Sequence, residues 1–250
     1  MSKDSEIRKI KKEISELNDE VQRALATIPR KLEELQIRMV HAINLDEDTE
    51  NYQHNFTHIT MEEALDRVND PDTRNLSKII KRTKQPTQTK LCLVGTDGSY
   101  RKANRQAYSI AAAYFSPTSS INLAIQIPGD GTSLLPELHA INLALKTVKE
   151  AQIKHVNLVV DNAVAINECH NFINRAPSQS PMVQNAIQRS IKHHKILNEI
   201  KKNAKYMDTL ILTWQESYIT ANSKFVDSNE GADQLFTSKF IKLHNSNRRF

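Results

Sequence analysis

Four acidic residues stand at points of the sequence from which a folded chain presents its functional groups. Apolar runs that are typical of buried strands end at Asp97 and again at Asp161. Glu137 and Asp233 each fall in the first turn of a predicted helix. Side chains at strand ends and at the starts of the connected helices can meet at one edge of a sheet, so we expect these four carboxylates to converge.

Carboxylates that converge repel one another and raise one another's pKa unless cations neutralise them. Oxygen ligands with open coordination positions suit Mg²⁺ or Mn²⁺. Two such ions about 4 Å apart stabilise the attacking and the leaving oxygens of phosphodiester hydrolysis. Any one of these acids alone is more often a surface residue or an acid favoured by a helix dipole. Their joint placement favours a metal-dependent hydrolytic site.

The elements that would position these acids follow from hydrophobic periodicity. Beyond residue 90 the predicted order is β-β-β-α-β-α-α-β-α, and the last three strands need crossover helices, so part of the sheet must be parallel. Strands are predicted at 91–97, 106–115, 120–127, 155–160 and 209–214, and helices at 134–151, 163–173, 183–204 and 230–242. The sequence therefore predicts an α/β fold with a mixed five-stranded sheet flanked by helices.

Residues 1–44 carry apolar side chains at alternating spacings of three and four. This heptad pattern predicts an α-helical, coiled-coil-like region. Pro29 interrupts the pattern, so the region is either one kinked helix or a helical hairpin. Its apolar seam either joins copies of the chain into a homo-oligomer or packs on the chain's own domain, and the sequence favours neither.

Residues 45–89 are predicted to form a linker with short helices. A capping box at Thr60 starts one helix, and a second short helix is predicted to end near Arg82. The basic stretch 81–90 contains no apolar residue apart from a proline, so we place the domain boundary there. The main folded domain is then expected to span residues 90–250.

Composition limits the partners and the compartment. The formal net charge of +5 favours a polyanionic partner such as nucleic acid. The only cysteines, Cys92 and Cys169, indicate no disulfide framework and a reducing compartment. No apolar run approaches the roughly 20 residues that span a bilayer, and the polar N-terminus lacks the apolar core of a signal peptide. We therefore expect an intracellular protein, nuclear or cytoplasmic, that is neither secreted nor bound to a membrane.

Each acid lies in a short motif. The motifs are Thr96-Asp97-Gly98-Ser99, Pro136-Glu137-Leu138-His139-Ala140-Ile141, Leu158-Val159-Val160-Asp161-Asn162 and Asn229-Glu230-Gly231-Ala232-Asp233-Gln234-Leu235. In their order and spacing they resemble the four motifs of type 1 ribonuclease H, across roughly residues 90–240. The proline-flanked glutamate is most similar to retroelement ribonuclease H domains. The order Asp-Glu-Asp-Asp differs from that of transposases and integrases of the same fold, in which the Glu comes last.

The resemblance implies a ribonuclease H-like catalytic domain over 90–250 that cleaves the RNA strand of RNA–DNA hybrids with two Mg²⁺ ions, for which Mn²⁺ can substitute. It implies that Asp97 bridges both ions and that Asp233 completes one site. Glu137 and Asp161 would complete the other site. We also expect the nucleic acid to contact residues near these acids and on the basic predicted helix. These are Ser99, Tyr100, Asn104, Arg105, Ser133, Asn162, Lys192 and Lys195.

This sequence departs from the family pattern in three places. The family's turn after the first Asp is glycine-rich and contacts the RNA 2′-OH, whereas residues 100–107 contain no glycine. Tyr218 follows Trp214 at the position where the family has a mobile histidine that aids product release. A separate basic protrusion is missing, although lysines of the predicted helix 183–204 offer a similar surface.

These departures leave two alternatives to an active nuclease. One is a ribonuclease H-like module that binds nucleic acid or protein with little or no catalytic activity and is oligomerised by its N-terminal helices. The other is an accessory scaffold whose coiled coil is the functional part. The presence of all four acids favours the nuclease, because a module freed from metal chemistry has no physical reason to cluster four carboxylates.

Overall fold

The computed structural model describes residues 56–103, 106–127, 132–175, 193–217 and 223–246. The chain divides into two compact units, Met1–Ile43 and Asn44–Phe250, and all described residues belong to the second unit. The predicted heptad region over residues 1–44 lies outside the described residues, as do Asn104, Arg105 and Lys192. Within the described ranges, no helix is both long enough and apolar enough to cross a membrane.

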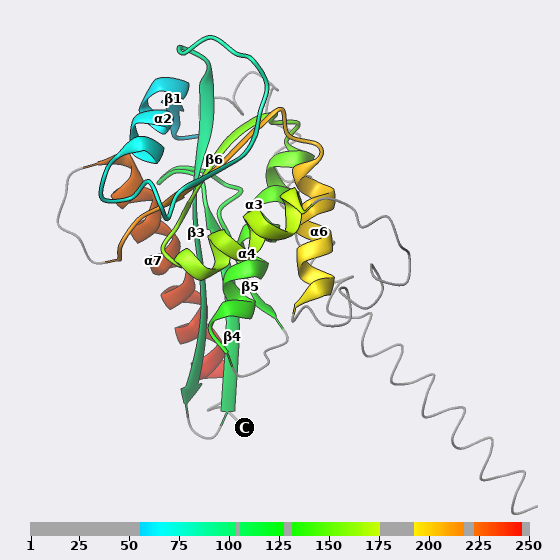
Figure 1. Ribbon diagram of the computed structural model, residues 1–250. Helices are drawn as coiled ribbons and strands as arrows, with labels where there is room; N and C mark the ends of the chain where they lie inside the picture. Colours follow the sequence, from blue (N-terminus) through cyan, green and yellow to red (C-terminus); the bar gives the residue numbers. More distant parts are fainter. Residues whose placement is uncertain (1–55, 104–105, 128–131, 176–192, 218–222, 247–250) are drawn as a thin grey trace, which may run out of the picture. The chain divides into compact units, whose positions relative to one another are not determined.

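The second unit is built on one mixed sheet with the strand order β2-β7-β6-β3-β4-β5, and β1 pairs with β3 (Figure 1). The strands are β1 His58–Thr60, β2 Lys78–Arg82, β3 Lys90–Ala103, β4 Gln106–Tyr114, β5 Leu123–Ile127, β6 His155–Val160 and β7 Thr209–Trp214. β6 runs parallel to both β3 and β7, and the other pairs are antiparallel. The predicted α/β class and mixed sheet are confirmed, but the described sheet has seven strands rather than five.

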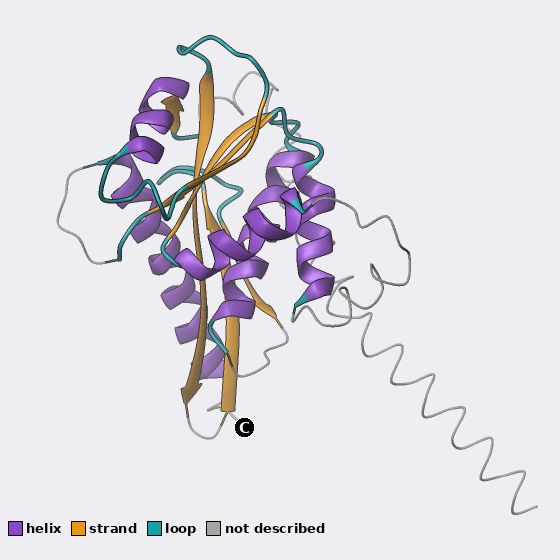
Figure 2. Ribbon diagram, in the orientation of Figure 1, coloured by secondary structure: helices purple, strands orange, loops and turns teal. Residues whose placement is uncertain are grey.

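Helices cover both faces of this sheet (Figure 2). They are α2 Met61–Asn69, α3 Leu134–Glu150, α4 Ala163–Asn174, α6 His194–Ala204 and α7 Lys224–Ser246. The two figures show α2 and α7 on one side of the strands and α3, α4 and α6 on the other. The sheet therefore lies between two helical layers, and apolar residues of its central strands are buried.

The segment predicted to be a linker is part of the sheet. The capping box at Thr60 is present, since its hydroxyl accepts a hydrogen bond from the Glu63 backbone N–H at 3.1 Å and the Glu63 carboxylate accepts one from the Thr60 N–H at 2.6 Å. The predicted second helix is wrong, because Lys78–Arg82 forms strand β2 on the edge of β7. Two adjacent isoleucines and an unpaired sheet edge outweigh the local helix propensity. The domain boundary expected near residue 90 therefore falls inside the compact unit.

Two further helix predictions need correction. The helix predicted over 183–204 does not pass through His193, whose φ of 63° is left-handed, and α6 begins at His194. The last helix begins at Lys224 rather than at residue 230, so Asp233 lies about two and a half turns into α7 instead of in its first turn. This early part of α7 packs closely on β3, since a side chain at Gly95 would overlap the backbone of Ser228.

Candidate active site

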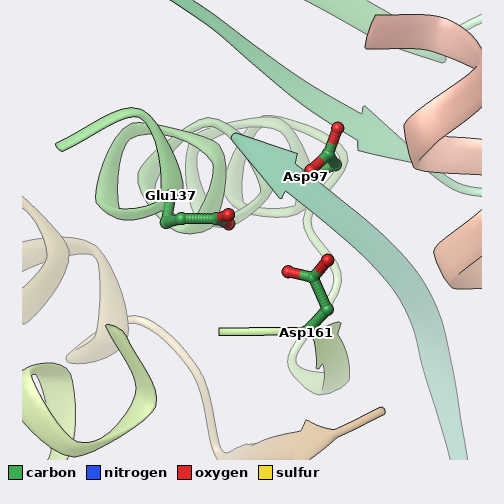
Figure 3. Close-up of side chains that lie close together, drawn as sticks. All are labelled: Asp97, Glu137 and Asp161. Atoms are coloured by element: carbon green, nitrogen blue, oxygen red, sulfur yellow. The ribbon is translucent and has the colours of Figure 1, made fainter. Parts of the chain in front are cut away.

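Three acids from three different elements meet at one edge of the sheet. Asp97 belongs to β3, Glu137 to the first turn of α3, and Asp161 follows the last residue of β6. Each offers one carboxylate oxygen, and these three oxygens lie within 4.8 Å of one another. Figure 3 shows the three side chains converging. We call Asp97, Glu137 and Asp161 the acidic cluster.

Strand pairing explains why Asp97 and Asp161 are neighbours. The parallel ladder between β3 and β6 ends at the pair Thr96–Val160, and the two acids are the next residues on their chains. The prediction that Asp97 ends its strand is wrong. β3 continues to Ala103 as an antiparallel ribbon with β4, because β4 pairs with it from Gly95 onward. Asp97 is therefore at the end of the parallel ladder but in the middle of β3.

Glu137 reaches the cluster because Gly98 has no side chain. A Cβ atom at Gly98 would overlap the backbone of Pro136 and of Glu137. The first turn of α3 thus packs directly on β3, one residue beyond Asp97. The Asp97–Gly98 pair does not form a turn, which is its commonest use; the glycine permits a close backbone approach that sets the position of Glu137.

Asp161 is held by two residues at the end of β7. The Ser217 hydroxyl donates a hydrogen bond to Asp161 Oδ2 at 2.7 Å, and the Trp214 indole N–H donates one to the Asp161 backbone carbonyl at 3.0 Å. The neighbouring Asn162 caps α4 by accepting a hydrogen bond from the Ala165 N–H at 3.1 Å. These contacts fix both the backbone and the carboxylate of Asp161.

Burial and mutual repulsion make the protonated forms of the cluster more stable. Burial, followed by the charges of Asp161 and Asp233, raises the pKa of Asp97 to about 7. Burial, followed by the charges of Asp161 and Asp97, raises the pKa of Glu137 well above its usual range. Burial also raises the pKa of Asp161, although the hydrogen bond from Ser217 opposes this rise. The charge of Arg101 lowers the pKa of Asp97 but does not offset these effects.

Two oxygen atoms in the cluster have no hydrogen-bond partner among the described residues. They are Asp97 Oδ2 and Glu137 Oε2, and their residues are 8% and 5% exposed. Unpaired buried carboxylate oxygens are costly unless a proton or a cation compensates them. Converging hard oxygen atoms with free lone pairs are the donor set that Mg²⁺ and Mn²⁺ prefer, so the residues fit a divalent cation.

This electrostatic arrangement predicts an unusual dependence of stability on pH. Between about pH 4 and 7 the folded chain keeps a proton on Asp97 that the unfolded chain has lost, so the free energy of unfolding should fall as the pH rises through this window. A divalent cation should reverse the effect, because it binds the ionised cluster of the folded chain. At pH 8, a cation at roughly ten times its dissociation constant should raise the melting temperature by about 3–5 °C.

Thermal melts at pH 5 and pH 8, each with EDTA or Mg²⁺, measure this prediction. The cation should raise the melting temperature at pH 8 and have little effect at pH 5. The exposed Asp66 on α2 does not line the cleft, so Asp66→Asn should behave like the unchanged chain. An equal shift at both pH values, or no shift at either, would contradict a cation site made of these acids.

Asp233 is the fourth predicted acid, and it is not part of the close cluster. It lies on α7 and lines the same cleft as the other three. Its charge helps to raise the pKa of Asp97 after the larger effects of burial and of Asp161. Of the four predicted acids, the structure therefore brings three together and places the fourth on the wall facing them.

The cluster lies in a cleft of about 630 Å³. Three residues predicted to contact nucleic acid line this cleft, namely Ser99, Ser133 and Asn162. Tyr100 and Lys195 do not line it. The sequence reasoning did not select several other lining residues, which are Arg101, Val164, Trp214, Ser217 and Asn229.

For two of these residues, their spacing from a predicted acid could have indicated a place in the cleft. Arg101 follows Asp97 by four in an alternating strand, and Asn229 precedes Asp233 by one helical turn. Ser217 had no local signal, because its contact with Asp161 joins residues 56 apart in sequence.

Comparisons with known proteins identify the family of this chain. The family model for RNase H matches residues 88–240, which is more than half of the chain and includes all four acids. No curated protein matches the sequence. Among solved structures, the solution structure of the PFV RNase H domain is 16% identical, with a TM-score of 0.45, over 58% of this chain and 92% of that chain. Because the family model matches more than half of the chain, the chain belongs to the RNase H family.

Proposed function

We propose that the chain is an endoribonuclease that cleaves the RNA strand of RNA–DNA hybrids by two-metal-ion hydrolysis. The observation that carries the proposal is the acidic cluster, in which three carboxylates converge, those of Asp97 and Glu137 are buried, and one oxygen of each buried acid has no hydrogen-bond partner among the described residues. Membership of the RNase H family supports the substrate class. The net charge of +5 supports a polyanionic partner.

Four acids would hold the two ions. Asp97 would be the shared ligand, as the resemblance to the family implies, and the charges of both Asp161 and Asp233 act on it. When bound, two Mg²⁺ ions, or Mn²⁺ in their place, would supply Lewis acidity and lower the pKa of a bound water. The chain's own part is to fix the positions of these carboxylates. Gly98 does this for Glu137, and Ser217 and Trp214 do it for Asp161.

Polar residues beside the cluster provide contacts for the substrate. The hydroxyl of Ser99 and the exposed Ser133 at the start of α3 both line the cleft. Ser133 makes no side-chain capping hydrogen bond, so its hydroxyl remains available. These hydroxyls can donate to phosphate oxygens or pair with the RNA 2′-hydroxyl, which distinguishes RNA from DNA.

A panel of labelled duplexes tests the substrate class. In Mg²⁺, the chain should cleave RNA–DNA hybrid and should cleave double-stranded RNA far less. Its affinity for hybrid should fall steeply with salt, because phosphate contacts release counterions. Equal cleavage of double-stranded RNA would show that the proposed substrate is wrong. A flat salt response would argue against a nucleic-acid partner.

Gly98→Ala should greatly lower the rate of hybrid cleavage, while the variant remains folded. The new methyl group must push the first turn of α3 away from β3, and Glu137 would move with it. A displacement of about 1 Å at a catalytic group can lower the rate about 100-fold. The rate of hybrid cleavage and the melting temperature should be measured on the same sample. A variant that keeps the activity of the unchanged chain would show that this close approach does not position Glu137.

Ser217→Ala should weaken metal dependence without unfolding the chain. Its hydroxyl holds Asp161 Oδ2 at 2.7 Å, and loss of such a supporting contact typically lowers metal affinity or activity about tenfold or more. The Mg²⁺ concentration for half-maximal cleavage should therefore rise. Ser238→Ala, at an exposed position of α7, is the matched control and should leave it unchanged. The same Mg²⁺ requirement in both variants would exclude a positioning role for Ser217.

A further inference from the structure

Arg101 is a cation on the wall of an acidic cleft. It lies on β3, where side chains alternate between the two faces, so Asp97, Ser99 and Arg101 point to the same side. All three line the cleft that holds the acidic cluster. The strand rises about 3.3 Å per residue, which places Arg101 about 13 Å along β3 from Asp97.

Two aromatic rings of α7 hold the Arg101 guanidinium. Its central carbon lies 4.5 Å from the ring centroid of Phe236 and 5.5 Å from that of Phe240. Phe236 is fully buried in an apolar cluster with Ile110 and Ala112, so this platform is rigid. Stacking on an aromatic ring leaves the edge of the guanidinium, which carries its N–H donors, free for other partners.

Within the described part of the chain, Arg101 makes no close ion pair. Among the residues that the structure describes, no carboxylate lies within 4.0 Å of its nitrogen atoms, although its charge faces Asp97 from within the same cleft. Arg101 is also exposed. An exposed, oriented guanidinium beside carboxylates that repel a polyanion is suited to bind the anionic group that must approach them.

We propose that Arg101 binds a backbone phosphate of the duplex in the cleft, a few nucleotides from the bond that is cut. The planar fork of N–H donors on arginine matches phosphate oxygens and binds them in a bidentate manner. The residue thereby fixes the register of the substrate relative to the acidic cluster. This role rests on the proposed function, and it assigns a side-chain contact to the segment 100–107, which lacks glycine.

Arg101→Gln tests the proposal against a charge-matched neighbour. Lys102 is exposed on the same strand, does not line the cleft and has its Nζ 5.9 Å from the Tyr100 ring centroid, so Lys102→Gln is the control. Arg101→Gln should raise KM for hybrid about tenfold, with kcat within about twofold, and lower the slope of log affinity against log salt by about one. Lys102→Gln should leave all three values nearly unchanged. Arg101→Lys should restore the salt slope but only part of the KM, because it keeps the charge and loses the fork.

A second measurement identifies the phosphate directly. Single phosphates on either side of the cut site are replaced, one at a time, by neutral methylphosphonates. At one position the loss of affinity caused by the replacement should disappear in Arg101→Gln, as a double-mutant cycle requires for two groups in contact. Additive losses at every position would overturn the proposal. A lower melting temperature with an unchanged salt slope would also overturn it, because Arg101 would then only pack on Phe236.

The two proposals fail in different ways. If the unchanged chain neither binds nor cuts hybrid, the proposed function fails and the role of Arg101 fails with it. If the unchanged chain cuts hybrid, and Arg101→Gln and Lys102→Gln behave alike, only the assignment of Arg101 is overturned.

Discussion

Asp97→Asn should abolish cleavage of hybrid and, at the same time, stabilise the metal-free protein. The amide keeps the size of the side chain but removes the charge that the cluster shares with a cation. Removing one preorganised electrostatic contact of this kind lowers the rate by about 10³-fold. At pH 8 the metal-free variant should melt at a higher temperature, because it no longer buries an ionised group that burial and neighbouring acids disfavour.

The combination of lower activity and higher stability separates a catalytic ligand from a structural residue. Asp66→Asn makes the same chemical change at an exposed position of α2 and should alter neither property. Glu137→Gln provides a second test, because Glu137 shares the buried cluster. An Asp97→Asn variant that is folded and cuts hybrid at a rate within tenfold of the unchanged chain would remove Asp97 from the mechanism.

A chain that begins at residue 88, where the match to the family model starts, should not fold stably. It would lack β1, α2 and β2. In the 250-residue chain, one cluster buries Ile59, Met61, Ala64 and Val68 together with Leu91, Leu93, Val159 and Ile211. Burial of a large apolar side chain contributes roughly 1.5–3 kcal/mol, so this loss approaches the total stability of about 5–15 kcal/mol expected for a domain.

Thermal unfolding and limited proteolysis of two shortened chains measure this prediction. The chain 44–250 keeps the whole second compact unit and should melt cooperatively, whereas the chain 88–250 should be digested rapidly and show no cooperative transition. Comparable melting temperatures for the two shortened chains would show that β1, α2 and β2 contribute little to the stability of the domain.

Local patterns predicted the elements whose residues carry a strong periodic signal. The five strands from β3 to β7 correspond to apolar or alternating runs, and α3 and α4 follow from helical stripes. Asp161 lies where its pattern placed it, directly after β6. The order of the acids along these elements was enough to predict that Asp97, Glu137 and Asp161 converge, because parallel neighbours bring their carboxyl ends to one edge.

The features that the sequence did not predict depend on contacts between segments that are far apart in the chain. β1 has three residues and β2 has five, and each is a strand only because it pairs with a distant partner, β3 or β7. The extension of β3 beyond Asp97 depends on β4, so the place of Arg101 on the cleft wall was not visible either. The close approach of α7 to Gly95 joins segments far apart in the sequence, and no local propensity encodes it. The contact between Ser217 and Asp161 likewise joins distant segments.

Cleavage of a strand-labelled hybrid tests the central claim most directly, namely that the acidic cluster supports hydrolysis of RNA paired with DNA. The RNA strand and the DNA strand carry different labels, and the reaction is run with Mg²⁺, with Mn²⁺ and with EDTA. We expect cleavage of the RNA strand alone, with either cation and not with EDTA. Attack by water leaves a phosphate monoester and a hydroxyl at the cut. Cleavage of the DNA strand, activity in EDTA, 2′,3′-cyclic phosphate ends or an intact hybrid under all conditions would contradict the account.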